Sequence, residues 1–320
     1  MDVRTLRRTP RSLCGPGWHR LARMIVALVA AIGLAGATEG MASADEASTK
    51  SGPPQPNIVA AALYALADPT ISPPGANDWS CRPSAAHPRP VVLSNGTGAN
   101  AYDDWAGLSG VLAQDGYCVF VPNLGGPPGF MLQTIGRIED TAAGFAQFVD
   151  RVLAATGAST VDIVGHSQGG MMPRYYIKNL GGASKVHSLI ALAPSNHGTT
   201  LNGLLNVITS LPGGSAILGM ACEACLEQQA GSPFLTQLNS GGETRSGINY
   251  VTIATKRDEI VTPYTSAFLA DAPNVVNTTV QAYCWPDLTE HINITYDPVA
   301  IRLVRNALDP AHAVRPGCWG

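Results

Sequence analysis

Hydrophobic residues in this chain fall into short runs that alternate with longer amphipathic stretches. The short runs are rich in β-branched residues and apolar at nearly every position, so they predict strands covered on both faces. They lie at residues 91–93, 117–121, 161–164, 189–192, 250–254 and 280–283. The amphipathic stretches predict helices at 103–113, 138–155, 170–180 and 298–308. This alternation predicts an α/β domain with a mostly parallel central sheet flanked by helices.

One segment interrupts the alternation. Residues 200–245 lie between two predicted strands, carry no strand pattern, and are crowded with apolar residues in their first half. No Lys, Arg, Asp or Glu occurs between His197 and Cys222. Two compatible interpretations are open, a buried pair of helices or an apolar cap over a site. We predict a cap or lid insertion at about residues 200–245.

The N-terminal 44 residues have the organisation of an export signal. Arginines precede an apolar run from Met24 to Ala35, and small residues at 42–44 offer a cleavage site. The run is too short for a spanning helix, and the alternative is an anchor that is never cleaved. Residues 45–60, rich in Ser, Pro, Gly and Ala, predict a flexible segment, and residues 61–320 a single domain. We expect a secreted protein without stable membrane insertion.

Charge and cysteine content narrow the possible partners. The chain is 45% hydrophobic and 13% charged, and after residue 44 it carries 14 basic and 21 acidic residues. No basic stripe remains for nucleic acid, and we expect a monomer. Six cysteines remain, an even number that predicts disulfides in an exported chain and leaves their pairing open. Cys222 and Cys225 could be half of a zinc site, but a short disulfide loop is favoured because no second ligand pair follows.

The stretch VDIVGHSQGG at 161–170 places Ser167 between a predicted strand and a predicted helix. This is the arrangement of a nucleophile elbow, in which a strained turn exposes the serine and the helix N-terminus favours a developing oxyanion. Glycines at 165 and 169 fit because strand and helix approach too closely for a Cβ atom. The alternative is an ordinary strand-to-helix turn that contains a serine.

A serine nucleophile needs a histidine base and an acid that orients it, and in this fold class the acid precedes the histidine. His291 follows the last predicted strand and precedes the last predicted helix, so we predict it as the base, with His197 as the rival. Asp258 follows a predicted strand directly, at the sheet edge where the sites of open α/β sheets lie, and is the predicted acid. The alternative for Asp258 is a surface carboxylate paired with Lys256 or Arg257.

The oxyanion hole requires two donors. One is predicted to be the amide of Gln168, directly after the nucleophile. The other is predicted at Thr97, whose amide and hydroxyl lie in the glycine-rich loop SNGTGAN at 94–100. The loop lacks a nucleotide-binding pattern, and the chain shows no calcium cage, so we expect no cofactor and no metal.

Apolar residues beside these positions are predicted to hold an acyl chain. They come from the first half of the cap, from the loop before the helix at 138–155, and from the residues after Asp258. The predicted substrate-binding residues are Phe130, Leu201, Leu204, Leu205, Ile260 and Val261. The expected partner is an ester or lipid substrate, including substrate at a lipid–water interface.

From Trp79 to Asp309 the sequence resembles the secreted bacterial triacylglycerol lipases of the actinobacterial class 2 group, in the α/β-hydrolase superfamily. The motifs that carry the resemblance are PVVLSNGTG at 90–98, GYCVF at 116–120, AATGA at 154–158, VDIVGHSQGGM at 161–171 and DEIV at 258–261. Shorter pieces are similar to the fungal lipase B type. The resemblance implies the triad Ser167, Asp258 and His291 with oxyanion donors Thr97 and Gln168. It also implies the disulfides Cys81–Cys118, Cys284–Cys318 and Cys222–Cys225.

The resemblance implies hydrolysis of acyl esters through an acyl-enzyme on Ser167. A carboxylesterase or a cutinase-like polyester hydrolase would share these catalytic residues. A cell-wall acyltransferase and a catalytically silent lipid-binding protein are further alternatives. Many relatives have His-Gly at the start of the oxyanion loop, whereas this chain has Asn95 and Gly96. We therefore expect different hydrogen bonding to shape the loop.

Overall fold

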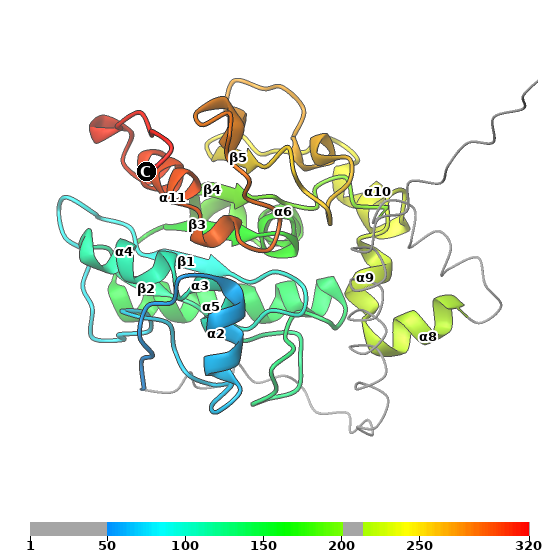
Figure 1. Ribbon diagram of the computed structural model, residues 1–320, viewed down its shortest axis with the longest axis horizontal. Coiled ribbons are helices and arrows are strands. Elements are labelled where there is room, and N and C mark those ends of the chain that lie inside the picture. Colours follow the sequence, from blue (N-terminus) through cyan, green and yellow to red (C-terminus); the bar gives the residue numbers. More distant parts are fainter. Residues whose placement is uncertain (1–49, 201–213, 320) are drawn as a thin grey trace, which may run out of the picture. The chain divides into compact units, whose positions relative to one another are not determined.

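A parallel sheet forms the centre of the domain in the computed structural model, which describes residues 50–200 and 214–319. Within these residues the sheet has six strands in the order β2-β1-β3-β4-β5-β6, and every pairing between neighbours is parallel (Figure 1). The strands are β1 (Val91–Ser94), β2 (Val119–Phe120), β3 (Val161–His166), β4 (Val186–Leu192), β5 (Asn249–Ala254) and β6 (Val275–Thr279).

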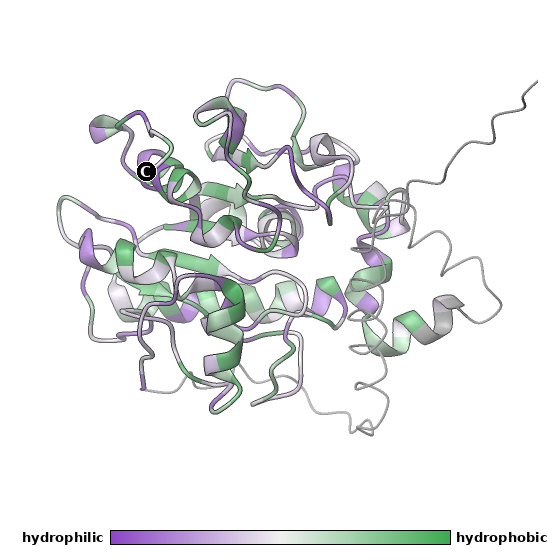
Figure 2. Cartoon of the chain, viewed as in Figure 1, coloured by the Kyte–Doolittle hydropathy of each residue, from purple (hydrophilic) through white to green (hydrophobic). Residues whose placement is uncertain are grey.

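Both faces of the sheet are buried because successive residues of a strand pack against different helices. On one face Val92 and Ile163 pack in a cluster with residues of α5 (Ile138–Thr156) and α6 (Gln168–Asn179). On the other face Val91 and Val164 pack with residues of α3 (Ala101–Trp105), α4 (Leu108–Gln114) and α11 (Pro298–Leu308). Strands β1 and β4 are accordingly largely hydrophobic (Figure 2). The continuous apolar runs in the sequence follow from this double coverage.

Helix α5 shows how the sequence specifies an element on the first face. Glu139 and Asp140 occupy its first turn, where their charges favour the positive end of the helix dipole. Phe145 and Val149 are among the buried residues that recur at helical spacing along the side facing the sheet. The helix ends at Gly157, whose φ of 73° places it in the left-handed region that glycine adopts without steric cost.

Two elements differ from the sequence-based expectation. The strand predicted at 280–283 is wrong, because Val280–Ala282 forms the 3-10 helix η4 and the strand β6 precedes it. Strand β6 contains Asn and Thr and lies at the edge of the sheet with only partial burial, so it lacks a continuous apolar run. Val280 is apolar because it is buried in the second core cluster. The helix predicted at 103–113 is instead two helices, α3 and α4, separated by residues 106–107.

The insertion between β4 and β5 is helical where it is described. It contains α8 (Gly214–Ala221), α9 (Glu223–Glu227) and α10 (Pro233–Asn239). Ala224 of α9 and Leu235 of α10 are buried in the same core cluster as α5 and α6. The predicted cap residues Leu201, Leu204 and Leu205 lie outside the described residues.

The start of the described chain is attached to the domain. Ser51 forms a parallel bridge with Ser72, within the part of the sequence predicted as flexible. Asn57 then caps α2 (Ile58–Ala65) by accepting a hydrogen bond from the Ala60 amide, and α2 packs beside α3. The remaining short helices are η1 (Gly182–Ser184), η3 (Tyr264–Ala267), η5 (Ile294–Tyr296) and η6 (Pro310–His312). Among the described helices, none has the length and apolar character needed to cross a membrane.

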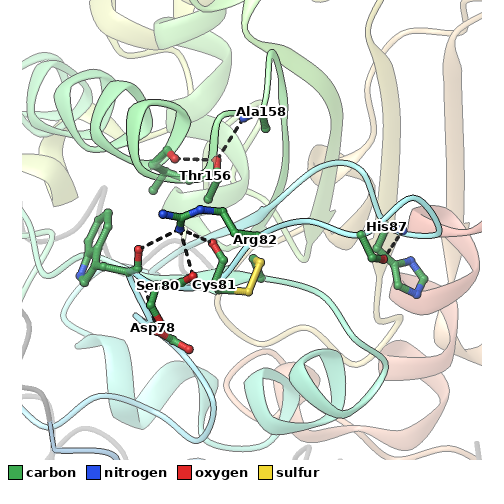
Figure 3. Close-up of a disulfide and its surroundings, with 11 residues drawn as sticks. Asp78, Ser80, Cys81, Arg82, His87, Thr156 and Ala158 are labelled. Atoms are coloured by element: carbon green, nitrogen blue, oxygen red, sulfur yellow. Dashed lines mark hydrogen bonds between the residues drawn. A yellow bond between two sulfur atoms is a disulfide. The ribbon is translucent and has the colours of Figure 1, made fainter.

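Three disulfides cross-link the domain, and they are the pairs that the resemblance implies. Cys81–Cys118 ties the segment before β1 to the segment before β2, and the Arg82 guanidinium donates to the Ser80 and Cys81 carbonyls at 3.0 Å each (Figure 3). This bridge closes a loop with a sequence separation of 37, for which loss of chain entropy in the unfolded state contributes about 4 kcal/mol. The others are Cys284–Cys318 and Cys222–Cys225, so the CxxC pair is a disulfide and not half of a zinc site.

Candidate active site

Ser167 lies in a strained turn between β3 and α6. Its φ of 52° and ψ of −122° are unusual for a residue with a side chain. The turn requires glycine on both sides of it: a Cβ atom on Gly165 would lie 1.9 Å from the Gly169 carbonyl oxygen, and one on Gly169 would lie 2.0 Å from the Ser94 oxygen. The sequence G-x-S-x-G therefore reflects the close approach of β1, β3 and α6 at this point.

Asp258 and His291 form a buried pair on the loops that follow β5 and β6. The Nδ1 atom of His291 lies 2.9 Å from Oδ2 of Asp258. The other carboxylate oxygen, Oδ1, accepts hydrogen bonds from the amides of Ile260 at 3.0 Å and Val261 at 2.7 Å. These amides fix the plane of the carboxylate and therefore the orientation of the imidazole. Asp258 is thus not a surface carboxylate paired with a neighbouring cation.

The loop that carries His291 is held by a second carboxyl group. Glu259 accepts a hydrogen bond from the His291 amide at 3.1 Å through Oε2, and burial raises the pKa of Glu259. The ring nitrogen Nε2 of His291 is not engaged by any residue in the described ranges 50–200 and 214–319. The backbone and Nδ1 of His291 are therefore both fixed by neighbouring carboxyl groups.

A further histidine connects the nucleophile turn to the His291 loop. His166 precedes Ser167 directly, and its Nε2 atom lies 3.1 Å from the His291 carbonyl oxygen. Its Nδ1 atom lies 2.8 Å from Oδ1 of Asp104, whose Oδ2 accepts from the Gly96 amide at 2.7 Å. This network brings Ser167 and His291 to the same edge of the sheet. Neither His166 nor Asp104 is among the predicted site residues.

The oxyanion loop is shaped by hydrogen bonds on both of its flanks. Asn95 donates to the Pro122 carbonyl at 2.9 Å and accepts from the Trp105 indole N–H at 2.9 Å, so its amide is committed to the scaffold. On the other flank the Gly98 amide donates to the Gln133 carbonyl at 2.8 Å. At the position where the chain departs from the His-Gly pattern, Asn95 therefore shapes the loop through these two hydrogen bonds.

Thr97 and Gln168, the predicted oxyanion donors, are in direct contact. The Thr97 hydroxyl donates to Oε1 of Gln168 at 2.6 Å and accepts from Nε2 of Gln228 at 2.7 Å. The hydroxyl proton is therefore directed at Gln168, which leaves the backbone amide of Thr97 as the donor for a ligand. The Gln168 amide is the first of α6, so the helix itself offers it no carbonyl partner.

Gln228 is a site residue that sequence reasoning missed. It follows α9 in the insertion, is buried, and also accepts from the Ser195 hydroxyl at 2.8 Å. The local sequence gives no signal for it, because Gln229 follows directly and Gln237 lies in the same insertion, and only the fold shows which amide is buried among polar partners. Gln228 attaches the insertion to both predicted oxyanion residues.

His197, the rival base, belongs to a separate pair. Its Nε2 atom lies 2.7 Å from Oε1 of Glu243, and its Nδ1 atom lies 3.1 Å from the Ser266 carbonyl oxygen. The hydrogen bond to Glu243 raises the pKa of His197. Both ring nitrogens are engaged in structural contacts, so this histidine does not have the arrangement of a general base.

The predicted substrate-binding residues have different environments. Phe130 is 43% exposed, whereas Val261 is buried against Ala254 and Ala267. Ile260 is partly buried, and its amide binds Asp258. A groove of about 340 Å³ lies between residues 125–136 and residues 219–223 of the insertion. Acyl binding by any of these residues remains a prediction.

Comparison with known proteins identifies the family. The family model for class 2 lipases matches residues 88–304. The chain belongs to the class 2 lipase family. Triacylglycerol lipases of Pseudarthrobacter phenanthrenivorans and Burkholderia plantarii are each 38% identical to it over 96 residues, which is 28% of this chain and 28% and 25% of theirs. Lipase B of Pseudozyma antarctica is 28% identical over 209 residues, 62% of this chain and 55% of that protein.

Solved structures place the chain in the α/β-hydrolase fold. Aspergillus fumigatus lipase B superposes with a TM-score of 0.59 at 21% identity, covering 92% of this chain and 67% of that one. The mature form of a Bacillus licheniformis lipase gives a TM-score of 0.51 at 17% identity, covering 73% of this chain and 95% of that one. At these identities the likeness shows the fold. The matched segments of the curated relatives span between a quarter and just over half of their own length.

Proposed function

We propose that this class 2 lipase is a secreted serine ester hydrolase that cleaves the carboxylic esters of acylglycerols through an acyl-enzyme on Ser167. The observation that carries the proposal is the buried Asp258–His291 pair, joined through the His291 carbonyl to the residue preceding a strained serine. A serine hydroxyl attacks only when a base removes its proton, and the base works best when a carboxylate fixes its tautomer.

The proposed reaction begins when Ser167 Oγ attacks the ester carbonyl carbon and Nε2 of His291 takes the hydroxyl proton. Asp258 stabilises the imidazolium that forms, and the amides of Thr97 and Gln168 stabilise the oxyanion. His291 then gives the proton to the departing alkoxide, and the acyl-enzyme remains. Water attacks it with His291 again as the base, and the carboxylic acid leaves as Ser167 recovers its proton.

The substrate class rests on similarity. Two curated relatives that match 96 residues of the chain are named triacylglycerol lipases, and the sequence of the insertion between β4 and β5 is apolar in its first half. Three disulfides fit a protein that folds outside the reducing cytosol, which supports export directed by residues 1–44. Acylglycerols, as uncharged esters with apolar chains, suit such a site better than charged esters do.

The test is hydrolysis of p-nitrophenyl esters from acetate to palmitate, followed by emulsified triacylglycerol, with Ser167→Ala as the matched control. We expect turnover by the wild-type protein on long-chain esters and on the emulsion, and none above background by Ser167→Ala. Full activity in Ser167→Ala would overturn the assignment of the nucleophile. Turnover confined to short esters would indicate a carboxylesterase, and acyl transfer to an added sugar acceptor would indicate an acyltransferase.

A further inference from the structure

Three loops of the proposed catalytic edge meet at one buried pair, Asp104 and His166. The oxyanion loop binds Asp104 through the Gly96 amide at 2.7 Å. The nucleophile turn supplies His166 itself, and the loop with the base is bound through the His291 carbonyl at 3.1 Å. The Asp104 and His166 side chains are 0% and 4% exposed, so water does not compete for these bonds. One pair therefore connects all three segments that must be in register for the reaction.

The proton positions of this pair follow from its partners. A backbone carbonyl only accepts hydrogen bonds, so Nε2 of His166 must carry a proton to bind the His291 oxygen. Its Nδ1 atom faces a carboxylate oxygen at 2.8 Å, so a second proton lies between them. The pair thus holds two protons and has no net charge, as an imidazolium with a carboxylate. His291 must differ, because a general base needs its Nε2 unprotonated.

We propose that Asp104 and His166 are positioning residues for the ester hydrolysis proposed above. They set the distance between the oxyanion donors, the serine and the base. They touch neither the substrate nor the reacting atoms, so their effect passes through Gly96, Ser167 and His291. A displacement of a reacting group by about 1 Å lowers a rate by roughly 100-fold, which is the scale of effect expected here.

The charge state of the pair gives it a pH dependence. Burial disfavours the charged ring of His166, but Asp104, the hydrogen bond to it and the His291 carbonyl outweigh burial and raise the pKa of His166. The pair therefore keeps both protons to a higher pH than an ordinary imidazole would, and it loses one proton as pH rises through this raised pKa. Nδ1 then presents a lone pair to the carboxylate, and the connection weakens. The titratable groups around the pair are Asp103, Asp258, Glu259, His291 and Tyr296.

Asp104→Asn separates positioning from charge. The asparagine oxygen can accept from Gly96, and its NH₂ group can donate to Nδ1 of a neutral His166, whose Nε2 proton still binds the His291 carbonyl. All three bonds survive, and the net charge of the pair stays zero. Asp104→Leu removes two of the bonds with little change in volume. Asp103→Asn is the matched control, since it makes the same chemical change at the adjacent position of α3.

The experiment measures kcat, KM and the pH profile of kcat/KM on p-nitrophenyl butyrate for these variants, each checked by thermal melting. Asp104→Leu should lower kcat by about 100-fold with KM changed less than about threefold, because no substrate contact is lost. Asp104→Asn should retain kcat within about threefold near neutral pH. The alkaline limb of its profile should move to higher pH, since the variant works with a neutral His166 and has no proton to lose from the pair. Asp103→Asn should match the wild type.

Wild-type kcat in a folded Asp104→Leu would overturn the proposal, as would an Asp104→Asn variant that is as impaired as Asp104→Leu. An Asp104→Asn profile that coincides with the wild type would also overturn it, and this result decides the matter if Asp104→Leu does not fold. Failure of the proposed function is distinguished by Ser167→Ala. If Ser167→Ala is inactive while Asp104→Leu is fully active, only the positioning role is wrong.

Discussion

Two buried histidine–aspartate pairs lie at the same edge of the sheet and have nearly the same geometry. His291 binds Asp258 at 2.9 Å, and His166 binds Asp104 at 2.8 Å, in both cases through Nδ1. They differ at the other ring nitrogen: Nε2 of His166 binds the His291 carbonyl, whereas Nε2 of His291 is engaged by no described residue. Both histidines pair with a carboxylate, so the pairing does not distinguish them. The candidate base is the histidine whose Nε2 has no described partner, and the positioning residue is the one whose Nε2 is bonded to a carbonyl.

The pair of His197 and Glu243 extends this comparison to the surface. Nε2 of His197 binds the carboxylate and Nδ1 binds a backbone carbonyl, and the His197 side chain is 37% exposed. Within residues 50–200 and 214–319 a histidine lies beside a carboxylate five times, the two further pairs being His187 with Asp162 and His312 with Asp309. Among the described residues, only His291 has its Nε2 engaged by no described residue while its backbone is bonded to the residue preceding a strained serine.

The largest effects should follow from breaking the Asp258–His291 pair. In Asp258→Asn the side-chain NH₂ group would donate to Nδ1 of His291, which favours the tautomer with the proton on Nε2, where the imidazole cannot act as a base. His291→Ala removes the base itself. The value of kcat should fall by about 10⁴-fold or more in each case. Thermal melting should show both variants folded. The measurement is kcat on p-nitrophenyl butyrate, and a loss smaller than about tenfold in either variant would mean that another group activates Ser167.

An intermediate effect is expected at the second attachment of the oxyanion loop. Thr97→Val removes the hydroxyl that links Gln168 to Gln228 and leaves the backbone amide in place. We expect kcat to fall by about tenfold, less than the roughly 100-fold loss typical when an oxyanion donor itself is removed. Thr97→Ser restores the hydroxyl and should restore kcat. A loss in Thr97→Ser equal to that in Thr97→Val would show that the hydrogen bonds are not the cause.

The smallest effect on catalysis is expected at His197. His197→Gln should leave kcat within about twofold of the wild type, because the pair bonds to Ser266 and Ala270, beyond residues 258–261 that carry and orient the triad acid. The hydrogen bond to Glu243 raises the pKa of His197. Burial alone would raise the pKa of Glu243, but the bond to His197 and its charge lower it. The pair therefore stabilises the fold at pH values between the pKa of Glu243 and the pKa of His197. This stability is lost above the raised pKa of His197.

The corresponding measurement is the Tm of wild type and His197→Gln from pH 5 to pH 9. The variant should melt lower by a few degrees at about pH 6, and the difference should shrink towards pH 9. A Tm difference that grows with pH would contradict the assigned protonation, and a large loss of kcat at constant Tm would give His197 a role in the site.

Elements that depend on the residue types of one continuous stretch could be predicted from the sequence. Strand β3, the turn at Ser167 and helix α6 follow from one continuous stretch, in which steric demands at Gly165 and Gly169 are visible as residue types. The prediction of Asp258 as acid and His291 as base rests on chain order and strand ends, which restrict the choices in this fold class, and the two side chains lie 2.9 Å apart.

Contacts between distant segments could not be predicted in the same way. Asp104 and His166 are 62 positions apart, and Thr97 and Gln228 are 131 positions apart. Nothing in the local sequence around Asp104 distinguishes an aspartate that binds a histidine from one that only caps α3, as Asp103 does. Strand β6 was misplaced because an edge strand is partly exposed and needs no apolar run.

The central claim is that Ser167 is a nucleophile activated by Asp258 and His291. Labelling with a fluorophosphonate, followed by peptide mass spectrometry, tests it most directly, because the reagent bonds covalently to an activated serine. The expected result is one adduct per chain, located on Ser167, with labelling abolished in Ser167→Ala and slowed by orders of magnitude in His291→Ala. An adduct on another serine, or labelling of Ser167 at the same rate in His291→Ala, would contradict the account.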